Sequence, residues 1–164
     1  MGRRGRAPAA LALALLLGTA ALSGCGGGEG AAAGATVRVY VDVNLCPAAK
    51  RALAAAGGEA GELRVRVVCL DPVEGAALGS HRLKLATIGA NARRATQDSS
   101  AVAFVEPAGR ANRFAQPIVE EADLAYVNAS SGARAMASIL RAIEEADTGS
   151  SSVRDEVRKT LESS

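Results

Sequence analysis

Two cysteines are the residues of this sequence whose type and spacing most clearly suggest chemistry. Cys46 lies just beyond one predicted strand, and Cys69 lies at the end of the next one. If these strands are parallel neighbours, their C-terminal ends lie side by side, and a strand spacing of about 4.8 Å makes a disulfide geometrically reasonable. The chain also begins with an export signal, described below, and an even pair of cysteines in an exported protein favours a disulfide.

The alternative chemistry is that of a monothiol redox protein. The segment Asn44-Leu45-Cys46-Pro47 follows a predicted strand and precedes a predicted helix, and in this it resembles the active-site end of thioredoxin-like domains. The helix N-terminus would stabilise a thiolate there. However, Ala49 stands where a C-x-x-C motif has its second cysteine, and no proline precedes the third predicted strand as the cis-proline of those domains does. We therefore favour the disulfide, and the redox alternative requires a free Cys46.

The remaining reactive side chains form no recognisable catalytic set. His81, the single histidine, has no cysteine, histidine or acidic cluster at ligand spacing, so we predict a solvated side chain rather than a metal ligand. No Ser/His/Asp set, nucleophile elbow or phosphate-binding glycine loop occurs. We predict that the protein is not an enzyme and that it has no catalytic residue, metal or cofactor.

An alternation of strands and helices must position these residues. Residues 36–43 carry valine at alternate positions, residues 47–56 have a helical composition that ends at Gly57-Gly58, and residues 63–70 end in an unbroken apolar run. Further predicted elements follow: helix 81–97 with Ser80 as its N-cap, strand 101–105, helix 112–122, strand 124–128 and helix 133–146. The alternation predicts an α/β fold, doubly wound, with a mostly parallel sheet of about four strands and flanking helices.

The N-terminal segment has the pattern of an export signal with a lipid-attachment site. A basic start is followed by an apolar stretch, residues 7–21, and then by Leu22-Ser23-Gly24-Cys25, which matches the lipobox of bacterial lipoproteins. We predict a signal peptide over 1–24, lipidation at Cys25, a Gly/Ala tether over 25–35, the α/β lobe over 36–147, and a polar linker with a C-terminal helix over 148–164. The protein is then exported and anchored by lipid to the outer face of the bacterial cell membrane.

Charge and composition argue against one class of partner. Without the three arginines of the predicted signal, the 19 basic residues fall to 16 against 17 acidic ones. The mature chain is thus near neutral, and only 2% of the residues are aromatic. Nucleic-acid binding uses basic surfaces and aromatic stacking platforms, so we predict no nucleic-acid partner.

Residues 36–132 resemble the first lobe of type I periplasmic solute-binding proteins, the group that includes branched-chain amino acid receptors of ABC transporters. The resemblance is carried by Val39-Tyr40-Val41-Asp42, by residues 85–98 with their small and basic pattern, by residues 101–105 and 117–127, and by Ala129-Ser130-Ser131-Gly132. It implies a single lobe of that fold. Such receptors close two lobes over the ligand, and this sequence matches only one. A single lobe would leave the ligand half exposed and bind it weakly, unless a homodimer, a transporter or another second-lobe partner supplies the second wall.

The resemblance further implies which residues hold a ligand. In that family, loops after the third and fourth strands hold the charged ends of the ligand, and Ser130, Ser131 and Gly132 open a helix where an anion would be favoured. Simple helix capping explains the same residues equally well. After the third strand, Glu106–Arg110 replaces the usual glycine and serines, so the usual amino-acid ligand is not assured, and Arg110 joins the candidate ligand-binding residues.

The sequence thus predicts a membrane-tethered lipoprotein whose single lobe binds a small polar solute, such as an amino acid, in connection with ABC-type uptake. An interaction module that kept the fold and lost ligand binding is the alternative from another class. The monothiol redox protein is the weaker third hypothesis.

Overall fold

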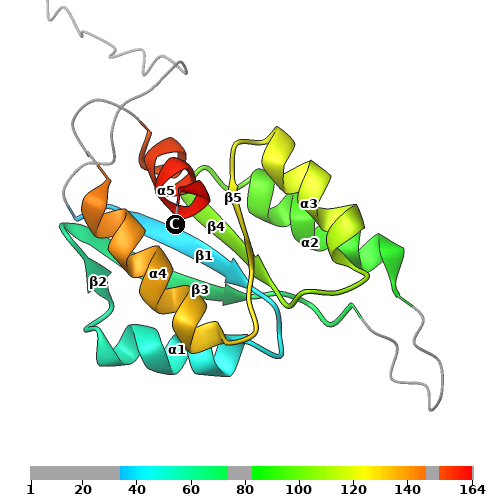
Figure 1. Ribbon diagram of the computed structural model, residues 1–164, viewed down its shortest axis with the longest axis horizontal. Coiled ribbons are helices and arrows are strands. Elements are labelled where there is room, and N and C mark those ends of the chain that lie inside the picture. The colour runs from blue at the N-terminus through cyan, green and yellow to red at the C-terminus, as the bar shows by residue number, and fades with distance from the viewer. Residues whose placement is uncertain (1–33, 74–82, 147–151, 164) are drawn as a thin grey trace, which may run out of the picture.

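The computed structural model describes residues 34–73, 83–146 and 152–163 (Figure 1). The predicted signal peptide, the lipidation site Cys25, most of the tether and of the 148–152 linker, Ser80 and His81 lie outside the described residues. Within the ranges that the structure describes, no helix has both the length and the apolar character needed to span a membrane.

A five-stranded sheet forms the centre of the fold, in the order β2-β3-β1-β4-β5. Four strands run parallel: β1 (Thr36–Val41), β3 (Leu63–Cys69), β4 (Ala101–Glu106) and β5 (Ala125–Asn128). The short β2 (Glu59–Ala60) pairs antiparallel with β3. The predicted α/β class with a mostly parallel sheet is confirmed. The sequence analysis missed β2, because two residues carry no periodicity.

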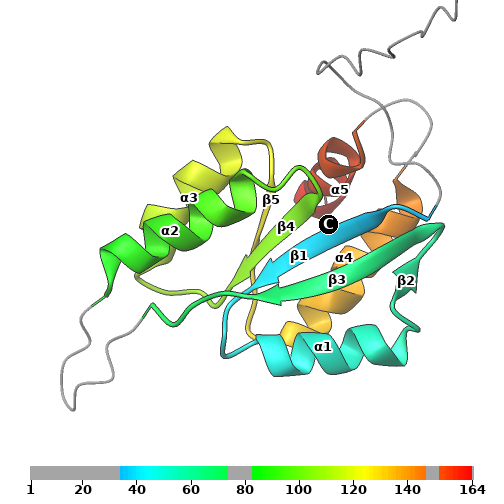
Figure 2. The same cartoon turned by 180° about the vertical axis from the view of Figure 1, so that it is seen from behind.

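Helices cover both faces of this sheet, as the two views show (Figures 1 and 2). One face carries α1 (Cys46–Ala55), α4 (Gly132–Glu145) and α5 (Val153–Glu162). The other carries α2 (Leu85–Thr96) and α3 (Asn112–Glu121). This is the doubly wound arrangement that strand-helix alternation favours.

The sheet separates two hydrophobic cores, because successive side chains of a strand point to opposite faces. Val39 and Val41 of β1 pack in the core under α1, α4 and α5, whereas Tyr40 packs in the core under α2 and α3. Every residue of β4 is buried, as expected of a parallel strand with a neighbour on each side and helices on both faces.

The start of α2 is a correction to the sequence analysis. The helix was predicted from residue 81, but Lys84 is not helical and donates its backbone N–H to the carbonyl of Val73 at 2.8 Å, so α2 begins at Leu85. Leu85 is apolar and lies three residues before the buried Ile88, yet its relative exposure is 55%, because the buried face of α2 begins with Ile88. A tertiary hydrogen bond therefore outweighed the local helical pattern.

The C-terminal helix α5 belongs to the packed fold. Val153 and Val157 are buried in the same core as α1 and α4. Arg154 donates three hydrogen bonds to backbone carbonyl oxygens, those of Ala101 at 2.9 Å, Ala122 at 3.3 Å and Asp98 at 2.6 Å. These bonds tie α5 to the N-terminal edge of β4 and to the end of α3.

Candidate functional site

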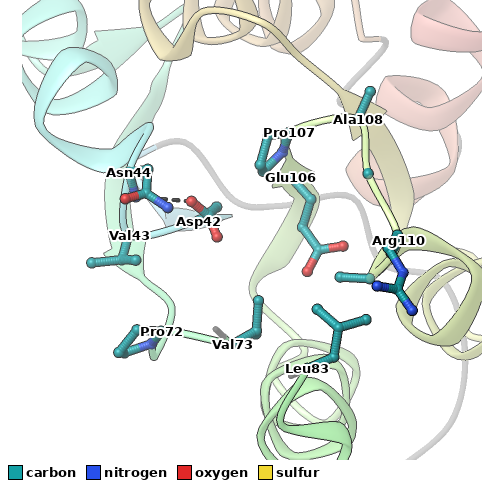
Figure 3. A pocket seen from close by; sticks show the side chains of 12 residues that line it. Asp42, Val43, Asn44, Pro72, Val73, Leu83, Glu106, Pro107, Ala108 and Arg110 are labelled. Carbon is teal, nitrogen blue, oxygen red and sulfur yellow. Dashed lines mark hydrogen bonds between the residues drawn. The ribbon is translucent and has the colours of Figure 1, made fainter. Parts of the chain in front are cut away.

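The strand order creates a crevice at one edge of the sheet. The chain leaves β1 through α1 to reach β3 on one side, whereas β4 leads through α3 to β5 on the other. In open α/β sheets, ligands bind outside the carboxyl ends of the strands at such a switch point. A cavity of about 520 Å³ lies there, within the size range of small-molecule sites, and its described lining comes from the loops after β1, β3 and β4: Asp42, Val43, Asn44, Pro72, Val73, Leu83, Glu106, Pro107, Ala108, Gly109, Arg110 and Ala111 (Figure 3).

Two acidic side chains are brought together in this cavity by the register of β1 and β4. Val41 is paired with Val105, so the next residues along these parallel strands, Asp42 and Glu106, are neighbours across the strand pair. Tyr40 and Phe104, two residues earlier, both pack on the face that carries α2 and α3. Because side chains alternate, Asp42 and Glu106 point to that same face. Figure 3 shows both carboxylates directed into the cavity.

Asp42 is held in place by the turn that joins β1 to α1. Its backbone N–H donates to the carbonyl of Val105, and its own carbonyl accepts from the N–H groups of Leu45 and Cys46 at 3.0 and 2.9 Å. One carboxylate oxygen, Oδ1, accepts the backbone N–H of Asn44 at 2.8 Å. Asp42 is only 3% exposed, so a rigid turn fixes the position of a buried carboxylate.

Glu106 is the more unusual of the two, because it is 2% exposed and only one of its two carboxylate oxygens has a hydrogen-bond donor among the described residues. Tyr126, on the neighbouring β5, donates its hydroxyl to Oε2 at 2.9 Å. Among the described residues, no group donates to Oε1. Burial raises the pKa of Glu106, the hydrogen bond from Tyr126 lowers it, and the negative charge of Asp42 raises it, with a net upward shift. Burial and the adjacent Glu106 charge likewise raise the pKa of Tyr126, so this hydroxyl stays a hydrogen-bond donor.

The rest of the cavity contrasts with this acidic pair. Val73 and Leu83 contribute apolar side chains opposite Glu106 (Figure 3). Arg110 is exposed and lies at the margin of the same cavity, in the loop that follows β4. Arg110 is thus the one of the four predicted ligand-binding residues that lines this cavity. It lies beside Glu106 rather than beside the two serines.

The other three predicted ligand-binding residues lie after β5 and do not line this cavity. Ser131 is the N-cap of α4, and its Oγ accepts the backbone N–H of Arg134 at 3.4 Å, while Ser130 Oγ accepts from the Arg134 guanidinium at 3.1 Å. Gly132 packs so closely on the start of α1 that a Cβ atom would collide with the carbonyl oxygen of Leu45. Capping and close packing account for these residues, and anion binding by them stays a prediction.

The two cysteines stand beside the cavity rather than in it. Cys46, the first residue of α1, and Cys69, the last residue of β3, lie at disulfide-bonding distance, with their Cα atoms 5.6 Å apart. This is the pairing expected from parallel neighbours. A bond here would hold together the loops after β1 and β3, which contribute Asp42 and Val73 to the lining.

Sequence reasoning missed Asp42 and Glu106 as site residues. It used Asp42 only as part of a family-like segment and Glu106 only as a departure from that family. The sequence did contain a usable signal, because Asp42 and Glu106 come at the ends of the first and third predicted strands. In a sheet of this order, these two strands flank the switch point at which ligands bind.

The arrangement can bind a small molecule through a buried hydrogen-bond acceptor, a second carboxylate and an apolar wall. In the part of the chain that the structure describes, no group of three or more His, Cys, Asp or Glu side chains is placed to hold a metal ion. No protein-family model, curated protein or solved structure matches this chain.

Proposed function

We propose that this protein is the solute-binding lobe of a lipid-anchored extracytoplasmic receptor, which binds a small polar solute in the cavity at the carboxyl edge of its sheet. Uptake through an ABC-type transporter is the process that such a lobe would serve. The lipobox at Cys25 and the resemblance of residues 36–132 to type I solute-binding proteins support the location and the class.

The observation that carries the proposal is the Oε1 oxygen of Glu106, to which none of the described residues donates a hydrogen bond. A buried polar atom without a hydrogen bond costs roughly 1–3 kcal/mol, so folded proteins rarely keep one unless a bound partner or water satisfies it. Here that atom belongs to a residue 2% exposed, which lines a cavity of about 520 Å³ at the switch point of the sheet. A ligand that donates a hydrogen bond to Glu106 would remove the penalty.

Thermal unfolding of the full chain in a non-ionic detergent tests this proposal. The sequence has no tryptophan, so unfolding is followed by far-ultraviolet circular dichroism, with amino acids, amines, carboxylates, amides and sugars each present at 10 mM. A solute at 100 times its Kd stabilises the fold by about 2.7 kcal/mol, which raises Tm by roughly 10 °C for a domain of this size.

The result separates a receptor from a non-binding interaction module. A reproducible rise in Tm that Glu106→Leu abolishes supports solute binding in this cavity. A cooperative transition that no class of solute moves favours the alternative function, a protein-interaction module that kept the fold. Glu145→Leu is the matched control, because Glu145 is an exposed glutamate on α4, on the opposite face of the sheet.

A further inference from the structure

We infer that the solute carries a protonated amine, and that its ammonium nitrogen binds between the carboxylates of Asp42 and Glu106. This inference rests on the proposed function and names the chemical class of its ligand. It predicts that the cavity is an ammonium site with an aliphatic wall, in which the cation rather than a carboxylate of the solute is the anchor.

The first argument is charge. Asp42 and Glu106 are neighbours in register, both nearly fully buried, and both directed into one cavity (Figure 3). Arg110 is the only basic residue in the described lining, and it is exposed at the margin. Two adjacent carboxylates with little access to water repel each other, and buried charges in proteins are normally paired. A cation from the ligand is the missing partner.

The second argument is the hydrogen-bonding capacity that remains. Asn44 occupies Oδ1 of Asp42, and Tyr126 occupies Oε2 of Glu106. Oε1 of Glu106 has no donor among the described residues, and the described hydrogen bond to the Asp42 carboxylate is made to Oδ1. The open positions are therefore acceptors on two carboxylates. A primary ammonium group offers three donors and a positive charge on one atom, which matches them.

The third argument concerns the other part of the ligand. Val43, Val73 and Leu83 form the apolar part of the wall, and Pro72 extends it. These side chains cannot hydrogen-bond, so a sugar-like ligand with hydroxyl groups all round would leave its polar groups unpaired there. A short aliphatic chain attached to the ammonium group fits this wall.

A set of probes that share the 3-methylbutyl group tests the inference by isothermal titration of the full chain in a non-ionic detergent at pH 7.5. The probes are 3-methylbutylamine, the neutral 3-methylbutan-1-ol and the anionic 4-methylpentanoate. We expect the amine to bind, and the alcohol and the carboxylate to bind at least tenfold more weakly. Glu106→Gln keeps the shape of the side chain and removes its charge, so it should weaken amine binding at least about tenfold. Glu145→Gln removes the same charge from the opposite face and should leave the Kd unchanged.

Asp42→Asn is a second test of the same site. It removes the negative charge of Asp42 and keeps a side-chain oxygen that can accept the Asn44 N–H. It should also weaken amine binding at least tenfold. If the alcohol or the carboxylate binds as tightly as the amine, or if both charge-removing variants bind it normally, the inference is overturned while solute binding stands. If the chain unfolds cooperatively and no solute of any class binds, both the inference and the proposed function fail.

Discussion

Replacement of Glu106 by glutamine should stabilise the ligand-free protein at neutral pH. The side chain is 2% exposed, its Oε1 atom has no donor among the described residues, and Asp42 adds a second negative charge beside it. Gln keeps an oxygen for the hydroxyl of Tyr126, which donates at 2.9 Å, and it adds an N–H donor that can face Asp42. An unsatisfied buried group costs roughly 1–3 kcal/mol, so we expect a gain of about 1–3 kcal/mol in the free energy of unfolding at pH 7.5.

The gain should depend on pH in one direction. The pKa of Glu106 is raised in the folded state above its ordinary value near 4.5, so the folded protein binds this proton more tightly than the unfolded chain does. The resulting stability is fully present below about pH 4.5 and is lost as pH rises through the folded-state pKa. The wild type should thus lose this contribution as pH rises above about 4.5 and through the folded-state pKa. The glutamine variant has no proton to lose there, so the difference between the two proteins should grow with pH.

Urea unfolding followed by circular dichroism at 222 nm measures both effects, with the wild type and Glu106→Gln compared at pH 4.5, 6.0 and 7.5 in the same detergent. The comparison cancels the titrating groups that the two proteins share and that lie away from Glu106. The reasoning would be refuted if the variant were less stable than the wild type at pH 7.5. It would also be refuted if the difference in unfolding free energy between the two proteins stayed constant across the three pH values. A variant that is more stable yet binds amines poorly would show that the site gives up stability for binding.

Three further predictions concern the elements that position the site. Gly132→Ala should lower the free energy of unfolding by roughly 1–3 kcal/mol in urea melts, because its Cβ would collide with the carbonyl oxygen of Leu45; an unchanged midpoint would contradict this packing. Arg154→Met keeps much of the side-chain length and removes three hydrogen bonds to backbone carbonyls. Limited proteolysis should therefore release α5 from the variant at least several-fold faster than from the wild type. Equal rates would show that the arginine does not hold the helix. Cys46→Ser should lower the free energy of unfolding by about 3 kcal/mol, because the disulfide closes a loop with a sequence separation of 23. Maleimide labelling of the unreduced wild type should find no free thiol at Cys46 or Cys69. A free thiol at Cys46 would revive the redox alternative.

Much of the fold follows from local patterns in the sequence. Alternating valines over 36–43 and the apolar run ending at residue 70 predicted two neighbouring parallel strands, and the structure pairs β1 with β3 in that way. The strong stripe of α4 and its N-cap at Ser131 were also predictable, because capping needs only a hydroxyl before the first turn. Elements whose position depends on contacts between distant parts of the chain were not predictable from such patterns. The start of α2 is set by a hydrogen bond to Val73, and β2 exists only because β3 pairs with it.

The candidate site shows the same division. Arg110 was named because the loop after the third strand departs from the pattern of the family that residues 36–132 resemble, and it does lie at the cavity. Asp42 and Glu106 are 64 positions apart in the sequence, and their relation depends on which strands are adjacent and on their register. Their positions at strand ends are visible in the sequence, but no local pattern shows that these two strands are adjacent or in which register they pair. The serines were named from the family resemblance and from helix-terminus chemistry. Their place beyond β5, at the edge of the sheet, sets them outside this cavity.

By itself, the sequence determined the fold class, the helices, four of the five described strands and the disulfide-compatible placement of the cysteines, because periodicity, caps and strand ends are short-range properties. Only the tertiary structure decided that two carboxylates share one buried cavity. The pairing of Val41 with Val105 brings Asp42 beside Glu106, and the helices on that face remove both from water. Electrostatics between buried groups depends on distance and solvation in the folded state, so this part of the chemistry appears only when the sheet has formed.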